Sequence, residues 1–392
     1  MKNNTILRLA DRLACARHSI QEMPVVIGFD AFLDESIRIV GERTSPEAYA
    51  PMASMSSFGQ WAMASAGHSG SREFVCEEVL AGGCAVNMGD GVASLGFPLT
   101  AFTGVGDPPH PAFQSFTEKC ESVYPLGMQP GRALVSEFDD GKLMLCSFSH
   151  FAEFTPSYLR QNLADGVFRR ACEQAGAIVF TSWSVYPYMT ACWQYLCREV
   201  LAGITNQPQF LFDLADPASR PVGDLRNMVS ALCEFESIGP VTLSLNGNEA
   251  KQLALALDMD DLGDHRSAIE KLAIELRHRL QIDTVCIHLL ASATMAQGSR
   301  AVTIDGPFCE RPQRSAGAGD RFNAGLLAGK LLGLDEAGCL YLGTASSGFF
   351  VRKSRSANWP ELVEFLSAWG SGNIEHESKE TNEVTGPKVI DT

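Results

Sequence analysis

The sequence predicts an α/β fold: a doubly wound, mostly parallel sheet with helices on both faces, to which a small β-sheet is added. Two observations carry this prediction. Short apolar runs alternate with helix-length stretches along most of the 392 residues, and such alternation is typical of βαβ units. Most of the runs are apolar throughout rather than at every second position, as expected of strands that are covered on both faces.

The elements of the main sheet can be placed in order along the chain. The expected strands are PVVIGF (24–29), LTAFTGVG (99–106), AIVFTS (177–182), FLFDL (210–214), VTLSLN (241–246) and TVCIHLL (284–290). The expected helices between them cover 156–174, 186–202, 221–236 and 264–281. An amphipathic helix is also expected near the amino terminus, where Asp11, Arg12 and Arg17 interrupt the apolar residues, so a signal peptide is not expected.

Two regions break this rhythm and suggest how the chain is divided. Residues 35–80 hold the strand-like segments ESIRIV and EFVCEEVL around a long insert, and 132–148 have the pattern of a hairpin around the turn DDGK. We expect 1–34 and 81–370 to form the α/β core, and 35–80, with or without the hairpin, to form the small sheet. The polar residues 371–392 are expected to be a disordered tail.

The composition excludes some partners and compartments. The net charge of −15 makes a poor surface for nucleic acid. No apolar run is long enough to span a membrane. The twelve cysteines include no CxxC pair, so we expect free, buried thiols in a reducing compartment, among them Cys146 and Cys286 in strand-like runs. A cytoplasmic protein is therefore expected.

The stretch RSAGAGDRFNAG (314–325) places small residues directly before an acid at the start of a predicted helix. Gly317, Ala318 and Gly319 leave consecutive backbone N–H groups open, and with the positive end of a helix dipole they form an anion site. An aspartate is redundant there as an anion. Asp320 fits instead as the acceptor of a proton from a hydroxyl that attacks a phosphate held by those N–H groups.

A simpler interpretation of this stretch stays open. Asp320 can be a helix cap, as short polar residues at helix starts often are. The glycines that follow it recur every four residues and can allow close helix packing; they are Gly325, Gly329 and Gly333.

Two further stretches place polar groups where strands end. Asp30 and Asp34 follow the first strand, and in AGGCAVNMGDGVASLG (81–96) paired glycines precede a helix that carries Asn87 early. Carboxylate and amide groups at the carboxyl ends of strands can bind the hydroxyls of a sugar. The alternatives are a solvated loop acid for the first stretch and a helix packed on the sheet for the second.

A fourth stretch, LSLNGNEAKQLALAL (243–257), has Asn246 and Glu249 after a buried strand. One interpretation is a capping box. The other places Glu249, through water, on the magnesium that accompanies a nucleotide. The sequence has no HExxH or paired CxxC motif, so a zinc site is not expected, and His288 is expected to be a core residue.

Taken in order, these stretches resemble the ribokinase family of carbohydrate kinases, of the phosphofructokinase-B type. GAGDRFNAG (317–325) is similar to the most specific motif of that family, its carboxyl-terminal signature. GGCAVN (82–87) resembles the sugar-binding motif GGxxxN, and NGNE (246–249) resembles the motif NxxE. The resemblance covers residues 24–370 in the order of elements and is dense at the motifs.

The resemblance implies a ribokinase-like fold with a small β lid and a reaction that uses ATP and Mg²⁺. It implies that Asp320 is the catalytic base and that the N–H groups of 317–320 form the anion hole. The residues implied for sugar contact are Asp34, Gly82, Gly83 and Asn87. Those implied for the magnesium and phosphates are Asn246 and Glu249, the latter through water. The lid would close over the sugar and exclude water.

Three departures from the family pattern bear on the donor and the ions. Arg314, Ser315 and Ala316 stand where the family commonly has Asp-Thr-Thr, which puts its potassium dependence in question and offers the charge of Arg314 to the phosphates. The sequence His288-Leu289-Leu290 stands in place of a Thr-Leu-Gly turn that helps to hold the nucleotide. The spacing GFDAFLD (28–34) is closer to that of ADP-dependent sugar kinases.

The predicted function is a sugar kinase that moves the γ-phosphate of ATP to a primary or anomeric hydroxyl. Three alternatives stay open: a kinase of the same fold for a nucleoside or vitamin-like alcohol, an ADP-dependent sugar kinase, and a catalytically weak sugar-binding regulatory protein. The expected partners are a small carbohydrate and a nucleotide, with no nucleic acid and no membrane. Lid sheets often pair in the resembled family, so a homodimer through the lid is expected.

Overall fold

The computed structural model describes residues 3–260 and 263–374, and its main feature is a nine-stranded sheet. In sheet order the strands are β14 (Arg300–Asp305), β13 (Ser292–Gln297), β12 (Thr284–His288), β11 (Val241–Asn246), β10 (Gln209–Asp213), β9 (Ala177–Phe180), β1 (Val25–Phe29), β5 (Leu99–Thr103) and β6 (Ser122–Tyr124). Neighbours from β12 to β6 are parallel, whereas β12, β13 and β14 pair antiparallel. The predicted mostly parallel sheet is confirmed, and all six expected strands belong to it.

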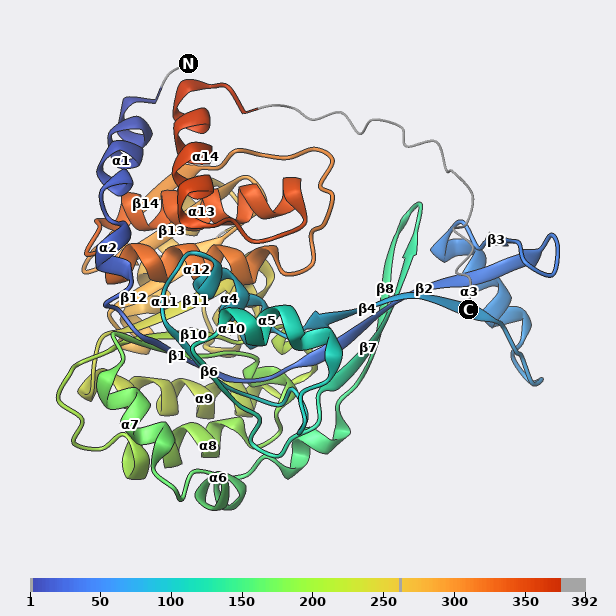
Figure 1. Ribbon diagram of the computed structural model, residues 1–392, viewed down its shortest axis with the longest axis horizontal. Coiled ribbons are helices and arrows are strands. Elements are labelled where there is room, and N and C mark those ends of the chain that lie inside the picture. The colour runs from blue at the N-terminus through green and yellow to red at the C-terminus, as the bar shows by residue number, and fades with distance from the viewer. Residues whose placement is uncertain (1–2, 261–262, 375–392) are drawn as a thin grey trace.

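Helices cover both faces of this sheet, as predicted (Figure 1). One face carries α1 (Asn4–Ala14), α2 (Arg17–Ile20), α4 (Cys84–Ser94), α5 (Gln114–Lys119), α12 (Ala318–Leu331), α13 (Glu336–Lys353) and α14 (Trp359–Ser371). The other carries α6 (Pro156–Asn162), α7 (Val167–Gln174), α8 (Met189–Tyr195), α9 (Val222–Glu234), α10 (Gly247–Ala256) and α11 (Arg266–Leu280). Side chains of a central strand pack into the helix layers on both faces of the sheet. On β1, Val25 and Ile27 belong to one apolar cluster and Val26 belongs to the other. This explains why the runs are apolar throughout.

Some helices differ in extent from the prediction. The stretch 156–174 forms two helices, since Gly166 at the start of α7 has a positive φ of 72° that a continuous helix does not allow. The helix expected at 186–202 begins at Met189, after Pro187, and continues as a π-helix over Leu196–Val200. The antiparallel strands β13 and β14 were not predicted.

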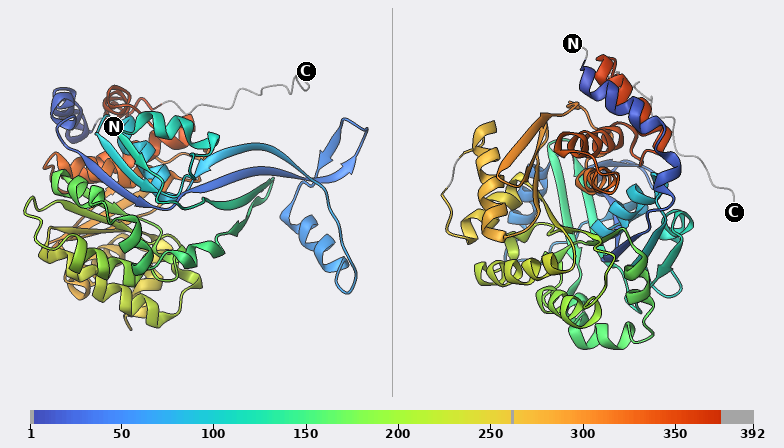
Figure 2. Two further views of the ribbon diagram at one scale, coloured as in Figure 1. Left: turned by 60° about the horizontal axis from the view of Figure 1, so that its bottom comes forward. Right: turned by 90° about the vertical axis from the view of Figure 1, so that its left-hand side faces the viewer.

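A second, five-stranded sheet projects from the body as a long arm (Figures 1 and 2). Its strands run in the order β3 (Tyr49–Pro51), β2 (Phe32–Arg43), β7 (Gly131–Phe138) and β8 (Gly141–Ser147), and β4 (Phe74–Gly82) also pairs with β2. The predicted hairpin at 132–148 thus lies in the same sheet as strands of the insert. The helix α3 (Met55–Ala64), at the outer end of the arm, has no buried residue.

The carboxyl-terminal prediction is wrong at its beginning. Ser371 still belongs to α14, which ends at Gly372 with a φ of 75°, and the N–H of Asn373 donates to the carbonyl of Ala368 at 2.8 Å. Helix capping by a left-handed glycine therefore extends ordered structure beyond the polar boundary in the sequence. The remainder of the expected tail, 375–392, lies outside the described residues.

The cysteines are free, as predicted, but they are not all buried. Cys286 lies in the core on β12, whereas Cys146 is exposed, as are Cys15 and Cys76. Cys146 lies on β8, an edge strand of the arm with an open face, so an apolar run there does not imply burial. Within 3–260 and 263–374, the search for a helix of the length and apolarity that a bilayer crossing requires finds none.

Candidate active site

The candidate site lies where the carboxyl ends of the central strands meet the first turns of three helices. Asp30 follows β1, Asp213 ends β10 and Asn246 ends β11. The helices α4, α10 and α12 begin at the same edge of the sheet and hold Asn87, Glu249 and Asp320, respectively. Open parallel sheets bind their ligands at this edge.

The start of α12 requires the two glycines that the sequence places there. Gly317 has a φ of 86°, and a Cβ on it would lie 2.5 Å from Nη1 of Arg321. A Cβ on Gly319 would lie 3.2 Å from the His288 ring. The N–H of Ala318 donates to the carbonyl of Ser315 at 3.1 Å, so of the four predicted anion-hole positions this one is already occupied by the chain.

The simpler interpretations of this stretch are partly confirmed. Gly317, not Asp320, is the N-cap of α12, so the capping interpretation of Asp320 is wrong. Close helix packing is confirmed at Gly329, where a Cβ would lie 2.7 Å from the Cα of Cys339 on α13, and Gly325 similarly faces α13. Gly333 has open space around it and a φ of 62°, so it ends the helix instead of packing.

Asp320 lies in the first turn of α12 with 8% of its surface exposed. Burial, followed by the charge of Asp213, raises the pKa of Asp320 to about 8. The positive charge of Arg321 and a hydrogen bond from the side chain of Asn87 act in the opposite direction. A carboxylate whose pKa is raised towards neutrality can accept a proton from a hydroxyl more readily than an ordinary aspartate can.

Asp213 is a member of the site that the sequence analysis did not single out. Its carboxylate accepts hydrogen bonds from the N–H of Ala215 and from Nδ2 of Asn323, both at 2.9 Å. The other end of Asn323 accepts a hydrogen bond from Ser244 at 2.6 Å. Burial raises the pKa of Asp213 to about 6. The signal was available, because Asp213 is an acid near the end of the predicted strand FLFDL.

Asn246 and Glu249 form the capping box that was one of their two interpretations. Oδ1 of Asn246 accepts from the N–H of Glu249 at 3.0 Å, and Oε2 of Glu249 accepts from the N–H of Asn246 at 2.8 Å. Glu249 is also crowded by other acids. Burial, followed by the charge of Asp213 and opposed by its backbone hydrogen bond, raises the pKa of Glu249 to about 9.

This group of acids suits a hard divalent cation. Mg²⁺ prefers oxygen ligands and keeps several of its waters. In the described part of the chain, His, Cys, Asp and Glu side chains form no cluster of three that could hold a metal ion directly. The donor chemistry around Glu249 therefore fits a magnesium ion held through water and by a bound phosphate, not a site enclosed by protein.

The four residues predicted to contact a sugar lie on neighbouring segments of the chain. A Cβ on Gly82 would lie 2.5 Å from the carboxyl atoms of Asp34, so Gly82 leaves the space that this side chain fills. Gly83, with a φ of 96°, is the N-cap of α4, and Asn87 lies one turn later. Asp30, the other acid of the first stretch, lies beside Gly83 but is fully buried and accepts hydrogen bonds from the chain.

The hydrogen bonds of Asp30 give it a structural role. It accepts from the N–H groups of Cys84 at 2.7 Å and Ala85 at 3.0 Å, and from Oγ1 of Thr181 at 2.7 Å. The carboxylate thus holds the first turn of α4 against β1, where the helix dipole also favours a negative charge. The interpretation of Asp30 as a solvated loop acid is wrong.

Arg314 lies near the sugar-side residues. Burial raises the pKa of Asp34, and the charges of Arg314 and then Lys142 oppose that rise. The guanidinium carbon of Arg314 is also 5.9 Å from the ring centre of Phe350. Its charge therefore reaches both Asp34 and Arg321, which lies in the first turns of α12.

A cavity of about 400 Å³ opens beside the start of α12. Residues that line it include Gly247, His288, Phe308, Ala318, Gly319 and Phe322. Burial lowers the pKa of His288 to about 4, so its ring is neutral near pH 7. The ring lies 4.9 Å from that of Phe322. His288 was expected inside the core, but it borders this cavity because β12 ends there.

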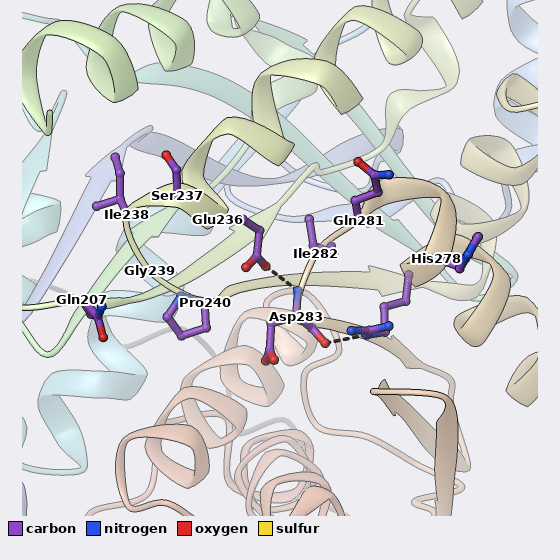
Figure 3. A pocket seen from close by; sticks show the side chains of 11 residues that line it. Gln207, Glu236, Ser237, Ile238, Gly239, Pro240, His278, Gln281, Ile282 and Asp283 are labelled. Carbon is purple, nitrogen blue, oxygen red and sulfur yellow. Dashed lines mark hydrogen bonds between the residues drawn. The ribbon is translucent and has the colours of Figure 1, made fainter.

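A second hollow, of about 680 Å³, lies at the opposite edge of the sheet (Figure 3). It is formed by the segments that lead into β11 and β12, including Glu236, Pro240, Arg277 and Asp283. Several of its polar groups are paired: Glu236 accepts from the N–H of Asp283, as Figure 3 shows. Glu236 also accepts from the N–H of Val241 at 3.0 Å, and Arg277 donates to the carbonyl of Asp283 at 2.8 Å. These contacts join the segments of the chain to one another, so this hollow is not the candidate site.

Known proteins resemble this chain in sequence and in fold. A model of the family described as prokaryotic ketohexokinase matches residues 6–369. The ketohexokinase of Haloferax volcanii is 26% identical over 385 residues, which cover 94% of this chain and 97% of that protein.

Solved structures show the same fold at low identity. The ribokinase of Arabidopsis thaliana, solved with ribose and ATP, has a TM-score of 0.61 and 16% identity, over 88% of this chain and 98% of its own. Phosphofructokinase-2 of Escherichia coli, solved with potassium, has a TM-score of 0.59 and 13% identity, over 89% and 99%. The predicted family resemblance and fold are confirmed. Since the family model covers most of its length, the chain is a carbohydrate kinase and belongs to the prokaryotic ketohexokinase family.

Proposed function

We propose that this kinase transfers the γ-phosphate of ATP to a primary hydroxyl of a ketohexose such as fructose. The observation that carries the proposal is the position of Asp320: a buried carboxylate of raised pKa, in the first turn of a helix that begins with glycine, beside Asn87. The family supports the choice of a ketohexose. The ribokinase solved with ATP supports the choice of donor.

In the proposed reaction the protein binds, orients and moves a proton. Asp34 and Asn87 hold hydroxyls of the sugar; Gly82 leaves the room in which the Asp34 carboxylate lies, and Gly83 begins the helix that carries Asn87. Asp320 takes the proton of the attacking sugar hydroxyl. The oxygen of that hydroxyl bonds to the γ-phosphorus while the bond between the γ-phosphorus and the oxygen that leaves with ADP breaks. The open N–H groups at the start of α12 bind the negative charge of the phosphoryl group in flight.

The nucleotide side of the site is assigned to three of the predicted residues. Asn246 and Glu249 keep the start of α10 in place, and Glu249 holds Mg²⁺ through water. When bound, the ion neutralises phosphate charge. Arg314 adds a fixed positive charge beside the sugar and phosphates, which supports a reaction without the potassium requirement of related kinases.

The arm is proposed to be the lid, with 1–34 and 81–370 as the catalytic core and 35–80 together with the hairpin as the moving part. Asp34 lies on β2 near the base of the arm, so a change in the angle of the arm moves a sugar-binding side chain. Closure would exclude water from the phosphoryl group, which protects ATP from hydrolysis.

The decisive experiment is a panel of sugars and donors. We expect Mg²⁺-dependent turnover of ATP that one ketohexose stimulates far more than ribose, glucose or a nucleoside does, and that Asp320→Asn lowers by about 10³-fold. Phosphorus NMR of the product gives the hydroxyl that is modified. Equal or faster turnover with ADP would contradict the choice of donor. Thermal stabilisation by a sugar without turnover would contradict the enzymatic role.

The same arm is proposed to pair two copies of the chain. The exposed apolar side chains on its strands are Phe74, Val79, Met144 and Leu145, and Met55 and Met63 are exposed on α3. Apolar residues gathered on one projecting sheet favour association, and the closed symmetric dimer is the commonest arrangement for soluble oligomers. Light scattering should give twice the chain mass, and Leu145→Lys with Met144→Lys should return it to one. A monomer for the unchanged chain would contradict this proposal without affecting the proposed chemistry.

A further inference from the structure

We propose that Arg321 is a positioning residue for phosphoryl transfer, because its buried guanidinium fixes the glycine-led turn from which α12 presents its N–H groups. The inference rests on the proposed function and deepens it. Neither the anion-hole N–H groups nor Asp320 can work unless the turn before them is held in one conformation. The contacts of Arg321 show how that is achieved.

The guanidinium of Arg321 joins four segments, and only 6% of the residue is exposed. Nη1 donates to the carbonyl of Gly317 at 3.4 Å, and Nε donates to Oγ of Ser356 at 3.2 Å. Nη2 contacts Oδ2 of Asp90 on α4 at 3.3 Å. The guanidinium carbon lies 4.4 Å above the ring centre of Phe350 on α13. A planar fork with several donors is suited to such a junction.

The partners of the guanidinium are themselves fixed. Oγ of Ser356 donates to Oδ2 of Asp90 at 2.6 Å, and Nζ of Lys119 lies 2.5 Å from Oδ1 of the same carboxylate. Asp90 lies on α4, the helix that also carries Asn87. Arg321 therefore ties the helix of the proposed base to the helix of a proposed sugar ligand.

The hydrogen bond from Arg321 to the carbonyl of Gly317 also affects the orientation of the next N–H group, because both belong to one peptide unit. The carbonyl of Gly317 and the N–H of Ala318 lie in one rigid plane, so holding the first also orients the second. That N–H closes a turn onto the carbonyl of Ser315 at 3.1 Å. The N–H groups that follow the turn, those of Gly319 and Asp320, belong to the first turn of α12, where N–H groups have no partner within the helix.

The charge of Arg321 acts on the base as well. Its positive charge lowers the pKa of Asp320, against burial and Asp213, which raise it. The titratable groups that face this carboxylate are Asp213 after β10, Asp30 after β1, Glu249 on α10, Cys84 on α4 and Arg321 itself. Loss of the guanidinium would leave acids and a thiol around the base and no opposing charge from α12.

The competing interpretation is a buried ion pair that only stabilises the fold. It predicts that variants lose stability and keep the kinetic constants of the fraction that remains folded. A positioning role predicts a fall in kcat with the KM for the sugar nearly unchanged, and an upward shift of the acid limb of kcat/KM. These outcomes separate the two interpretations.

The experiment uses Arg321→Ala and Arg321→Lys in the full-length protein. For Arg321→Ala we expect kcat to fall at least about 100-fold, as misplacement of catalytic groups by ~1 Å can cause, with KM for the ketohexose within threefold. Guanidinium chloride at millimolar concentration should raise the kcat of Arg321→Ala at least tenfold. Arg321→Lys keeps the charge without the fork, so it should melt near the unchanged protein and still lose about tenfold in kcat.

A control and a readout that needs no turnover complete the test. Arg169→Ala also removes an arginine that binds two carbonyls and a carboxylate, but on α7, far along the chain from the site; it should leave kcat unchanged. Hydrogen exchange of the peptide spanning 314–321 should rise in Arg321→Ala and not in Arg169→Ala. If Arg321→Lys keeps full kcat, or exchange is unchanged in Arg321→Ala, the inference is overturned. No turnover by the unchanged protein would instead overturn the proposed function.

Discussion

The main sheet has acids at both ends of its parallel strands, a half-buried one at the amino-terminal ends (the amino edge) and buried ones at the carboxyl-terminal ends (the carboxyl edge), and α12 connects the two. Asp320 lies in its first turn at the carboxyl edge, and Lys330 lies near its other end at the amino edge. Ten residues of helix separate them by about 15 Å. The two ends of α12 therefore lie in different environments. At one end the negative charge of an acid is balanced by a lysine, and at the other the acids lie beside further acids.

At the amino edge a half-buried acid has partners supplied by the chain. Asp283 accepts hydrogen bonds from Nζ of Lys330 and Nε2 of Gln297, both at 3.0 Å, and from Oγ1 of Thr284 at 2.7 Å. Burial alone would raise its pKa, but these partners, led by the charge of Lys330, outweigh it and lower the pKa of Asp283. This acid joins β12 to α12 and stabilises the fold.

At the carboxyl edge burial and like charge act in the same direction. They raise the pKa of Asp213, Glu249 and Asp320, whose hydrogen-bond partners do not compensate. Such a group costs stability unless a proton or a ligand relieves it, so its presence indicates a function. The comparison teaches that the balance of charge, and not burial of acids as such, distinguishes the active edge from the structural one.

The largest expected effect comes from neutralising the acid at the carboxyl edge. Asp320→Asn should lower kcat by about 10³-fold, within the range that general base catalysis contributes. The sugar should still bind, and the melting temperature should rise because a repelled carboxyl is removed. Steady-state kinetics, calorimetric titration with the ketohexose and thermal melting measure the three quantities.

The same substitution at the amino edge is the matched control. Asp283→Asn should leave kcat within a factor of two. A large loss of kcat in Asp283→Asn, or none in Asp320→Asn, would remove the functional distinction between the two edges.

The next effect concerns stability at the amino edge. Asp283→Asn removes the negative charge beside the largely buried ammonium of Lys330 and leaves it only neutral hydrogen-bond acceptors, so the free energy of unfolding should fall by about 2–4 kcal/mol. Urea unfolding measures it. Asp305→Asn is the control, because its pair with Arg266 is exposed on the Asp305 side and should contribute less than about 0.5 kcal/mol. Equal effects of the two variants would show that Asp283 is not a structural acid.

A smaller effect sharpens the comparison at the carboxyl edge. The acid limb of kcat/KM should have its midpoint near pH 8, because burial and then Asp213 raise the pKa of Asp320 to about 8. Asp213→Asn removes one repelling charge, so the midpoint should move to lower pH by up to about one unit. Hydrogen bonding can be kept, because a flip of the Asn323 amide satisfies both the new side chain and Ser244. A midpoint that stays in place would exclude Asp213 as a cause of the raised pKa.

Much of the sheet could be predicted from the sequence because its cause is local. A strand covered on both faces must be apolar throughout, and VVIGF and AIVF show this directly. The glycines at 317 and 83 could be predicted as well, since a left-handed turn at a helix start leaves a pattern of small residues. The order of the family motifs along the chain further indicated that these turns belong to one site.

The rest depends on contacts between distant segments, which the pattern does not carry. The position of Asp213 in the site depends on its hydrogen bond with Asn323, 110 residues later. The carboxylate of Asp30 accepts hydrogen bonds from the start of α4, so it is not free to bind a ligand. Arg321 stands inside a matched motif, yet its role follows from Asp90 and Ser356. The exposure of Cys146 follows from the position of β8 at an edge, which the sequence of the strand does not encode.

The smallest predicted effect is the pH dependence of stability that the carboxyl edge should impose. The pKa of Asp320 is raised to about 8 in the folded protein, and an unfolded aspartate titrates near pH 4, at about 3.9. Between these values the folded state keeps a proton that the unfolded state has lost, so stability from this group is present below about pH 4 and is lost as the pH rises to about 8.

Asp320→Asn lacks this pH dependence of stability. Its gain in melting temperature over the unchanged protein should therefore be near zero at pH 4.5 and grow to a few degrees at pH 8, whereas Asp305→Asn should show a constant, small difference. A gain that does not change with pH would mean that Asp320 is ionised throughout, and the contrast between the two edges would then rest on geometry alone.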